Sequence, residues 1–318
     1  MLERFLRCAE TWAELIVIID QASDDGSREI ASSHPKVHLI DYPGHDYDDE
    51  TRRGILIDTA RALVPGPRTL VALDADEALA TDVWEQPEWQ TLLAAAPGTV
   101  GQLQWINILP EEPRAWIPHD RTDIVFIDDD SEFHGLPMHG PRLPAPPGGT
   151  ILTPDAPKVL HLQYLDWDRM RSKQRWYQAQ DRLVYPRRRP IQIYRQYHFM
   201  DAIDPTERHP LKVEWLAGYD RIGVDLLAIE RRAYYPTDTR VLDLLLKHGQ
   251  RRFRRVALWD VDWSACAQAV GRTLPADFKR DPRSRLERAV FRWLAATQRR
   301  MLERRIRWIQ RALRLLDF

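Results

Sequence analysis

The chain has very few cysteines, only Cys8 and Cys266 among its 318 residues. So low a number excludes a small secreted domain held together by disulfides, and it fits a reducing cytosol. The sequence also lacks any run of about eighteen apolar residues, so it predicts no membrane-spanning helix. We therefore expect a cytoplasmic, globular protein.

The chain has almost no net charge, −1 at pH 7, yet its two halves carry strong and opposite charges. Residues 1–160 contain 12 Lys+Arg and 28 Asp+Glu, whereas residues 161–318 contain 34 and 19. Two interpretations stay open. The acidic half binds cations and the basic half faces anionic material, or the two halves attract each other.

Strand-like and helix-like segments alternate in the first half of the chain. Apolar runs predict strands at 15–20, 37–40 and 69–73, with helices at 27–33 and 49–63 between them. Further strands are expected at 100–108 and 123–127. This order is typical of an α/β fold whose mainly parallel sheet has helices on both faces. Seven prolines between Pro137 and Pro157 predict a long ordered loop, and loops of that length are often functional.

The end of the chain, 283–318, has the pattern of one long basic amphipathic helix. From residue 284 onward there are ten arginines against three acids. An apolar stripe runs through Leu302, Ile306, Ile309, Leu313 and Leu316. The helix either packs on the body of the protein with a solvated charged face, or lies on an anionic membrane surface as a peripheral contact at its inner face. We expect residues 236–318 to form a helical, basic C-terminal extension.

Two acidic motifs follow predicted strands. Asp74 and Asp76 come directly after the run 70–73, and the chain must turn there if both are to serve one site, because neighbouring side chains of a strand point to opposite faces. Asp20 ends the first strand, five residues before a turn that opens the next helix. The carboxyl edge of an α/β sheet is where ligands bind, and hard divalent cations prefer oxygen ligands.

Together the two motifs resemble the family-two glycosyltransferases of the GT-A fold. The matching residues are Asp20, Ser23, Asp25, Gly26 and Ser27, and then Leu73, Asp74, Ala75, Asp76 and Glu77. The resemblance covers roughly residues 1–165 and implies a Rossmann-like GT-A domain over 1–235. It also implies transfer of a sugar from a nucleoside-diphosphate sugar to a glycan or lipid-linked acceptor, with inversion, in the synthesis of cell-surface polysaccharide.

The resemblance also implies a role for each motif residue. Asp20 would contact the nucleobase of the donor, within a turn shaped by Ser23 and Asp25. Asp74 would reach the ribose or the metal, and Asp76 would hold a Mn²⁺ or Mg²⁺ ion that bridges the diphosphate. A departing nucleoside diphosphate gains negative charge, which a fixed cation stabilises.

Three further residues are candidates for the donor site, each with a structural alternative. His161 leaves a strand after the long loop and could return to the metal as a third ligand, or it could be a structural histidine. Lys173 could contact the diphosphate, or lie on a solvated helix face. Arg53 could point at the donor, or pair with an acid of its own helix.

The catalytic base is expected in the segment 125–139. An inverting transfer needs a group that takes the proton of the acceptor hydroxyl. We favour Asp129 or Asp128, with His139 behind them, although three successive aspartates could simply form a turn.

The chain departs from the family pattern at its start. The family usually begins with a strand and an Asn-Glu loop before the helix that starts here at Leu2, so the first strand is expected to be missing and a sheet position unpaired. Two other functions stay open. One is a non-catalytic sugar-nucleotide-binding module. The other is a haloacid-dehalogenase-like phosphatase, whose motif continues with Gly-Thr where this chain has Glu77 and Ala78. No nucleic-acid partner is expected.

Overall fold

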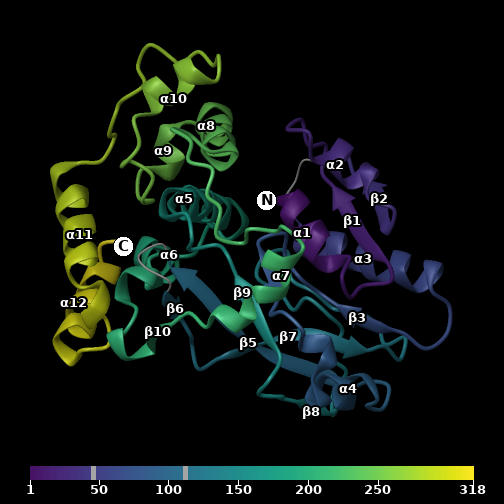
Figure 1. Ribbon diagram of the computed structural model, residues 1–318. Helices are drawn as coiled ribbons and strands as arrows, with labels where there is room; N and C mark the ends of the chain where they lie inside the picture. The colour runs from purple at the N-terminus through teal and green to yellow at the C-terminus, as the bar shows by residue number, and fades with distance from the viewer. Residues whose placement is uncertain (44–47, 110–113) are drawn as a thin grey trace. The chain divides into compact units, whose positions relative to one another are not determined.

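The computed structural model describes residues 1–43, 48–109 and 114–318 (Figure 1). This part of the chain mixes helices with strands, and its strands form two open sheets of two and eight strands. The chain divides into two compact units. Unit 1 comprises residues 1–165 and 207–229, and unit 2 comprises residues 166–206 and 230–318. The boundary expected near residue 235 is close to the third and last passage between the units, after residue 229, but residues 166–206 group with the C-terminal part.

The small sheet of unit 1 pairs β1 (Ile16–Asp20) in parallel with β2 (Val37–Asp41). The crossover is α2 (Ser27–Ser33), and Gly26 precedes it with φ of 85°, a left-handed conformation that suits glycine. Leu6 and Ala9 of α1 (Leu2–Ala9) pack against Ile16. Within the described residues, β1 pairs along one edge only.

The larger sheet is built around β5 (Val100–Leu109). The other strands are β3 (Thr69–Val71), β4 (Glu77–Leu79), β6 (Arg114–Trp116), β7 (Arg121–Ile127), β8 (Ile151–Leu152), β9 (Lys158–His161) and β10 (Arg208–Pro210). Only β8 and β9 run parallel to β5, and the other described pairs of this sheet are antiparallel. The prediction of a mainly parallel sheet is therefore correct for the small sheet and wrong for the larger one. Strands β5 and β6 follow each other closely in the sequence and pair antiparallel, because a parallel pair would need a long crossover connection.

Apolar side chains cover both faces of the larger sheet. On one face Leu103 and Ile124 pack with Trp89 of α4 (Pro87–Leu93). On the other, Ile106 and Leu160 pack with residues around α7 (Ala217–Arg221). Successive residues of β9 and β4 enter different clusters, as the alternation of a strand requires. The remaining elements of unit 1 are α3 (Asp49–Leu63), η1 (Val83–Glu85) and η4 (Val213–Trp215).

Unit 2 is helical in its described residues. Its helices are α5 (Trp167–Val184), α6 (Pro190–Tyr197), α8 (Pro236–His248), α9 (Gln250–Phe253), α10 (Trp263–Ala269), α11 (Arg285–Ala296) and α12 (Arg304–Arg314), with η2 (Phe199–Ala202) and η5 (Gln298–Arg300). Asp166 caps α5 by accepting from the backbone N–H groups of Asp168 and Arg169. Side chains of α6, α11 and the chain end share one apolar cluster.

The single terminal helix predicted for 283–318 is two helices, so that prediction is wrong. The hydroxyl of Thr297 donates to the carbonyl of Trp293 and the chain then makes the short turn η5, which ends α11. Ile306 of α12 is buried, whereas Leu302, Ile309 and Leu316 of the predicted stripe are exposed. No helix in the described ranges combines the length and the apolar character needed to cross a membrane.

Candidate functional site

The two carboxylates that follow β3 lie in a closed turn. The backbone N–H of Glu77 donates to the carbonyl of Asp74 at 2.8 Å, and the N–H of Asp74 donates to the Glu77 carboxylate at 3.0 Å. Strand β4 then begins at Glu77. Asp76 is buried, with 4% of its surface exposed, while Asp74 is exposed. The backbone therefore turns between Asp74 and Glu77, as it must if the carboxylates of Asp74 and Asp76 are to serve one site. We call residues 74–77 the acidic turn.

Arg142, which the sequence analysis did not single out, binds the acidic turn. Its guanidinium contacts both oxygens of Glu77 at 2.6 and 3.0 Å and the carboxylate of Asp74 at 2.9 Å. It also lies over the ring of Trp105, 5.5 Å from the ring centroid. Burial raises the pKa of Glu77 to about 7, although Arg142 opposes the rise. In the sequence, the only indication of this role of Arg142 was its position within the proline-rich loop.

His161 reaches the acidic turn through strand pairing. In the antiparallel pair of β4 and β9, Glu77 stands opposite His161, and the N–H of Leu162 donates to the carbonyl of Asp76 at 2.8 Å. The His161 Nδ1 lies 2.7 Å from the side-chain oxygen of Asn107, and the ring stacks on Trp105. Because that oxygen only accepts, Nδ1 donates this hydrogen bond, and in the neutral ring the lone pair would be on Nε2. A hydrogen bond of this kind orients metal-binding histidines.

The donor set of this region suits a hard or borderline cation. Carboxylate oxygens and a neutral imidazole are ligands that Mg²⁺ and Mn²⁺ accept. Among the described residues no three His, Cys, Asp or Glu side chains converge closely enough to hold an ion by themselves. Mg²⁺ is often held by one or two carboxylates together with substrate phosphates. The residues present would therefore hold an ion only together with a bound molecule that supplies further oxygen ligands.

Asp20 lies at the carboxyl end of β1 and is buried. Its carboxylate accepts from the N–H of Ser23 at 3.1 Å and from Arg28 at 3.2 Å. Burial opposes ionisation, but these hydrogen bonds and the charge of Arg28 outweigh it and lower the pKa of Asp20. Asp25 accepts from the N–H of Ser27 at 3.1 Å. Ser23 and Asp25 thus shape the turn, and Arg28 is a second residue that the sequence analysis missed.

Arg53 acts on the loop that carries Arg142. Its guanidinium donates to the carbonyls of Gly140 and Pro141 at 2.5 and 2.6 Å, directly before Arg142. It also lies 3.7 Å from the carboxylate of Asp49, the pairing considered as an alternative. These contacts make Arg53 a positioning residue of the loop.

The topology separates Asp128 and Asp129 from the acidic turn. The antiparallel pairing of β3 with β7 sets Ile127 opposite Thr69, so both aspartates lie at the start of β3, whereas the acidic turn follows its end. The buried carboxylate of Asp128 pairs with Arg61 at 2.8 Å and Arg68 at 2.6 Å. Burial opposes ionisation of Asp128, but the two arginines outweigh it and lower its pKa. For this reason we do not include either aspartate in the proposed site, and the expectation that one of them is the base stays a prediction.

Asp129 has a local role in its own turn, because its carboxylate accepts from the N–H of Ser131 at 3.0 Å. His139, the other candidate base, is exposed on the loop three residues before Arg142, with φ of 59°. Lys173 lies on α5 in unit 2, with its ammonium 5.9 Å from the centroid of the Tyr177 ring. A contact of Lys173 with the diphosphate stays a prediction.

Comparison with known proteins does not assign the chain to a family. No protein-family model matches the chain, and no curated protein matches it. The resemblance to glycosyltransferases therefore depends on the motif residues and on the site built from them.

Proposed function

We propose that the chain is a glycosyltransferase that takes a sugar from a nucleoside-diphosphate sugar with the help of Mn²⁺ or Mg²⁺. The acidic turn is the observation that supports this proposal best. Asp76 directly precedes Glu77, which pairs with His161 across the two strands, and Arg142 brings a positive charge to the same turn. The acceptor is a glycan or a lipid-linked sugar, and the protein acts in the cytoplasm.

Each residue of the site has a part in this proposal. Asp76, Asp74 and His161 are the residues that would hold the ion, and the ion would supply positive charge to stabilise the leaving nucleoside diphosphate. Arg142 supplies a second positive charge at the same turn. Asp20 holds the nucleobase end of the donor, and His139 is the remaining candidate for the base that takes the acceptor proton.

A thermal-shift screen of UDP-, GDP-, CMP- and dTDP-sugars, with and without Mn²⁺, tests the proposal. A donor that binds the native state raises the melting temperature, by mass action, only when the metal is present. Asp76→Asn should abolish that shift. Asp220→Asn, a change of an exposed aspartate in α7, is the matched control and should keep it. Undiminished binding by Asp76→Asn would overturn the metal assignment.

Turnover separates an enzyme from a binding module. We expect the chain to hydrolyse or transfer the sugar of the donor that the screen identifies, and His139→Asn to lose turnover while it keeps donor binding. Donor binding with no hydrolysis and no transfer to any glycan or lipid acceptor would favour the non-catalytic module.

A further inference from the structure

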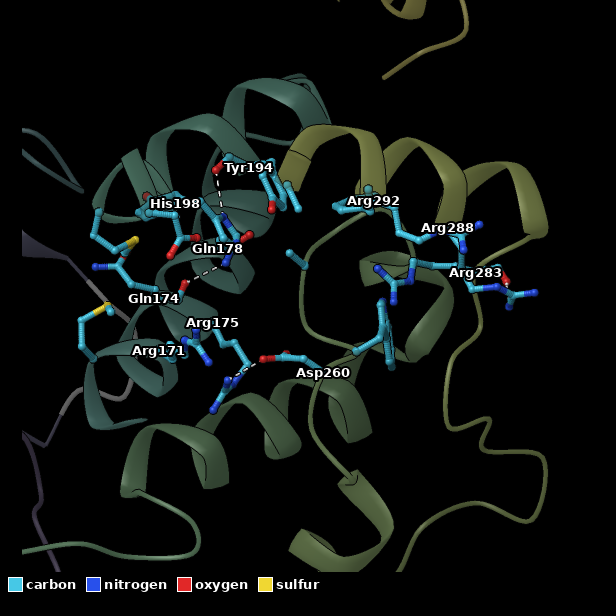
Figure 2. A pocket seen from close by; sticks show the side chains of 18 residues that line it. Arg171, Gln174, Arg175, Gln178, Tyr194, His198, Asp260, Arg283, Arg288 and Arg292 are labelled. Carbon is cyan, nitrogen blue, oxygen red and sulfur yellow. Dashed lines mark hydrogen bonds and ion pairs between the residues drawn. The ribbon is translucent and has the colours of Figure 1, made fainter. Parts of the chain in front are cut away.

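Unit 2 contains a cavity that the proposed transfer does not use. Its volume is about 560 Å³, within the range of small-molecule sites. Side chains of α5, α6 and α11 and of the segment 257–260 line it (Figure 2). Every lining residue belongs to unit 2.

The cavity is lined by five arginines: Arg171, Arg175, Arg283, Arg288 and Arg292. Arg175 pairs with Asp238 and Asp260 at 2.9 and 3.0 Å, and Arg283 pairs with Asp281 at 2.9 Å. Within the described ranges, Arg171, Arg288 and Arg292 form no ion pair with a carboxylate, although the charge of Arg288 helps to lower the pKa of Asp281 and its guanidinium donates to the carbonyl of Arg283 at 2.7 Å. Besides Asp260, Asp201 is the only acid in the described lining. Figure 2 shows Arg171 on one side of the cavity and the α11 arginines on the other.

Two residues of the lining each have a buried polar side-chain atom without a hydrogen-bond partner among the described residues. These atoms are the side-chain oxygen of Gln178, whose residue is 1% exposed, and the indole nitrogen of Trp259, whose residue is 7% exposed. The amide nitrogen of Gln178 donates to the carbonyl of Gln174, so its oxygen is the atom left to accept. A buried acceptor and a buried donor without partners are costly unless a ligand satisfies them.

An aromatic surface completes the cavity. The rings of Tyr194 and His198 stack with centroids 3.8 Å apart, and Phe291 meets Tyr194 edge-on at 5.7 Å. Burial lowers the pKa of His198, so its imidazole is neutral near pH 7. The positive charge of the cavity therefore comes from the arginines.

We propose that this cavity binds a small phosphate monoester that carries hydroxyl groups, such as a sugar phosphate. The phosphate takes the guanidinium groups of Arg171, Arg288 and Arg292, since a group with nearly two negative charges matches several cations better than a carboxylate does. A ligand hydroxyl donates to Gln178, and a ligand oxygen accepts from Trp259. A phosphorylated lipid headgroup presents the same chemistry as a free sugar phosphate.

Isothermal titration of the full chain with glucose 6-phosphate, inorganic phosphate and glucose tests the proposal. We expect saturable one-to-one binding of glucose 6-phosphate, weaker binding of phosphate and none of glucose. Arg292→Ala should weaken glucose 6-phosphate binding by roughly tenfold or more, the usual loss of a charged hydrogen bond. Arg285→Ala, an exposed arginine of the same helix outside the cavity, is the control and should change binding by less than about twofold.

Gln178→Met tests the hydroxyl contact separately, because it should weaken glucose 6-phosphate and leave phosphate unchanged. Vesicles with and without a phosphoinositide form the lipid arm, and binding to them that Arg292→Ala removes would assign the headgroup as the source. Binding of no phosphorylated probe in either arm, or binding that Arg292→Ala leaves intact, would overturn the proposal. Equal binding of phosphate and glucose 6-phosphate would overturn its hydroxyl part.

Discussion

At the scale of single residues, the site depends on contacts between distant parts of the sequence. The motif residues Asp20, Asp74 and Asp76 could be identified from the sequence because each lies within three residues of the end of an apolar run. Arg142 could not, since it meets Glu77 across 65 residues and only the path of the proline-rich loop brings them together. The spacing of apolar residues does not predict which part of the protein a long loop will contact.

Replacing Arg142 by alanine should destabilise unit 1. The change leaves the buried carboxylate of Glu77 without its ion pair, and breaking a buried pair costs about 3 kcal/mol. Urea denaturation measures the loss. The double change Arg142→Met with Glu77→Gln should recover much of it, because both charges are then gone. A loss well under about 1 kcal/mol for Arg142→Ala would show that this pair does not hold the turn.

His34 gives unit 1 a pH-dependent contribution to stability. Burial alone would lower its pKa, but hydrogen bonds to Glu3 at 3.1 Å and Glu10 at 3.0 Å outweigh burial and raise it. A raised folded pKa means that the stabilisation is fully present below the ordinary value of about 6.5 and is lost as the pH rises through the folded value.

His34→Asn should therefore lower the free energy of unfolding by up to about 1 kcal/mol at pH 5.5 and by less at pH 8.5, as urea denaturation at the two pH values would show. His38→Asn, a change in β2 of a histidine not involved in these pairs, is the control. An equal loss at both pH values would contradict the charge-based explanation.

At the scale of elements, the sequence predicted the positions of strands and helices better than it predicted which strands pair and in which direction. Strand β1, strand β2 and helix α3 lie close to their expected ranges because apolar runs and turn residues bound them. The sense of pairing in the larger sheet was missed, because it depends on which strands meet. The break between α11 and α12 was missed too, since no proline or glycine marks it in the sequence.

Helix α7 packs so closely that a methyl group cannot be added at Gly218. A Cβ there would lie 1.9 Å from the methyl carbon of Thr81. We expect Gly218→Ala to cost about 1–3 kcal/mol through overpacking, and Thr81→Ser in the same chain to restore much of the loss by removing that methyl group. Gly54→Ala in α3, where nothing lies within 4 Å, should instead be neutral or stabilising. Thermal unfolding of the three variants makes the comparison, and equal effects of the two glycine changes would contradict it.

At the scale of the whole molecule, the chain leaves unit 1 at residue 166 and returns at 207 before entering unit 2 for good. The sequence could not predict this return. The change in charge near residue 160 lies close to the first passage between the units, but no change in composition marks the two later ones. Each unit has an apolar cluster of its own, so each can unfold as a unit.

Leu294→Ala tests that independence. Leu294 is fully buried in the apolar cluster of unit 2, and its truncation should cost about 2–5 kcal/mol. Calorimetry should show two unfolding transitions. The substitution should lower the melting temperature of the unit 2 transition only, and a nucleotide-sugar should raise that of the unit 1 transition. A single transition that moves as a whole would mean that the units unfold together.

The two-stranded sheet that carries Asp20 has a consequence for how the site opens. An isolated pair of strands is marginally stable, and β1 and β2 rely on the helices packed against them. Amide protons of residues 16–20 and 37–41 should therefore exchange with solvent faster than those of β5, through local opening. A donor held by Asp20 would slow that exchange, so the nucleobase end of the site would be ordered by the molecule it receives.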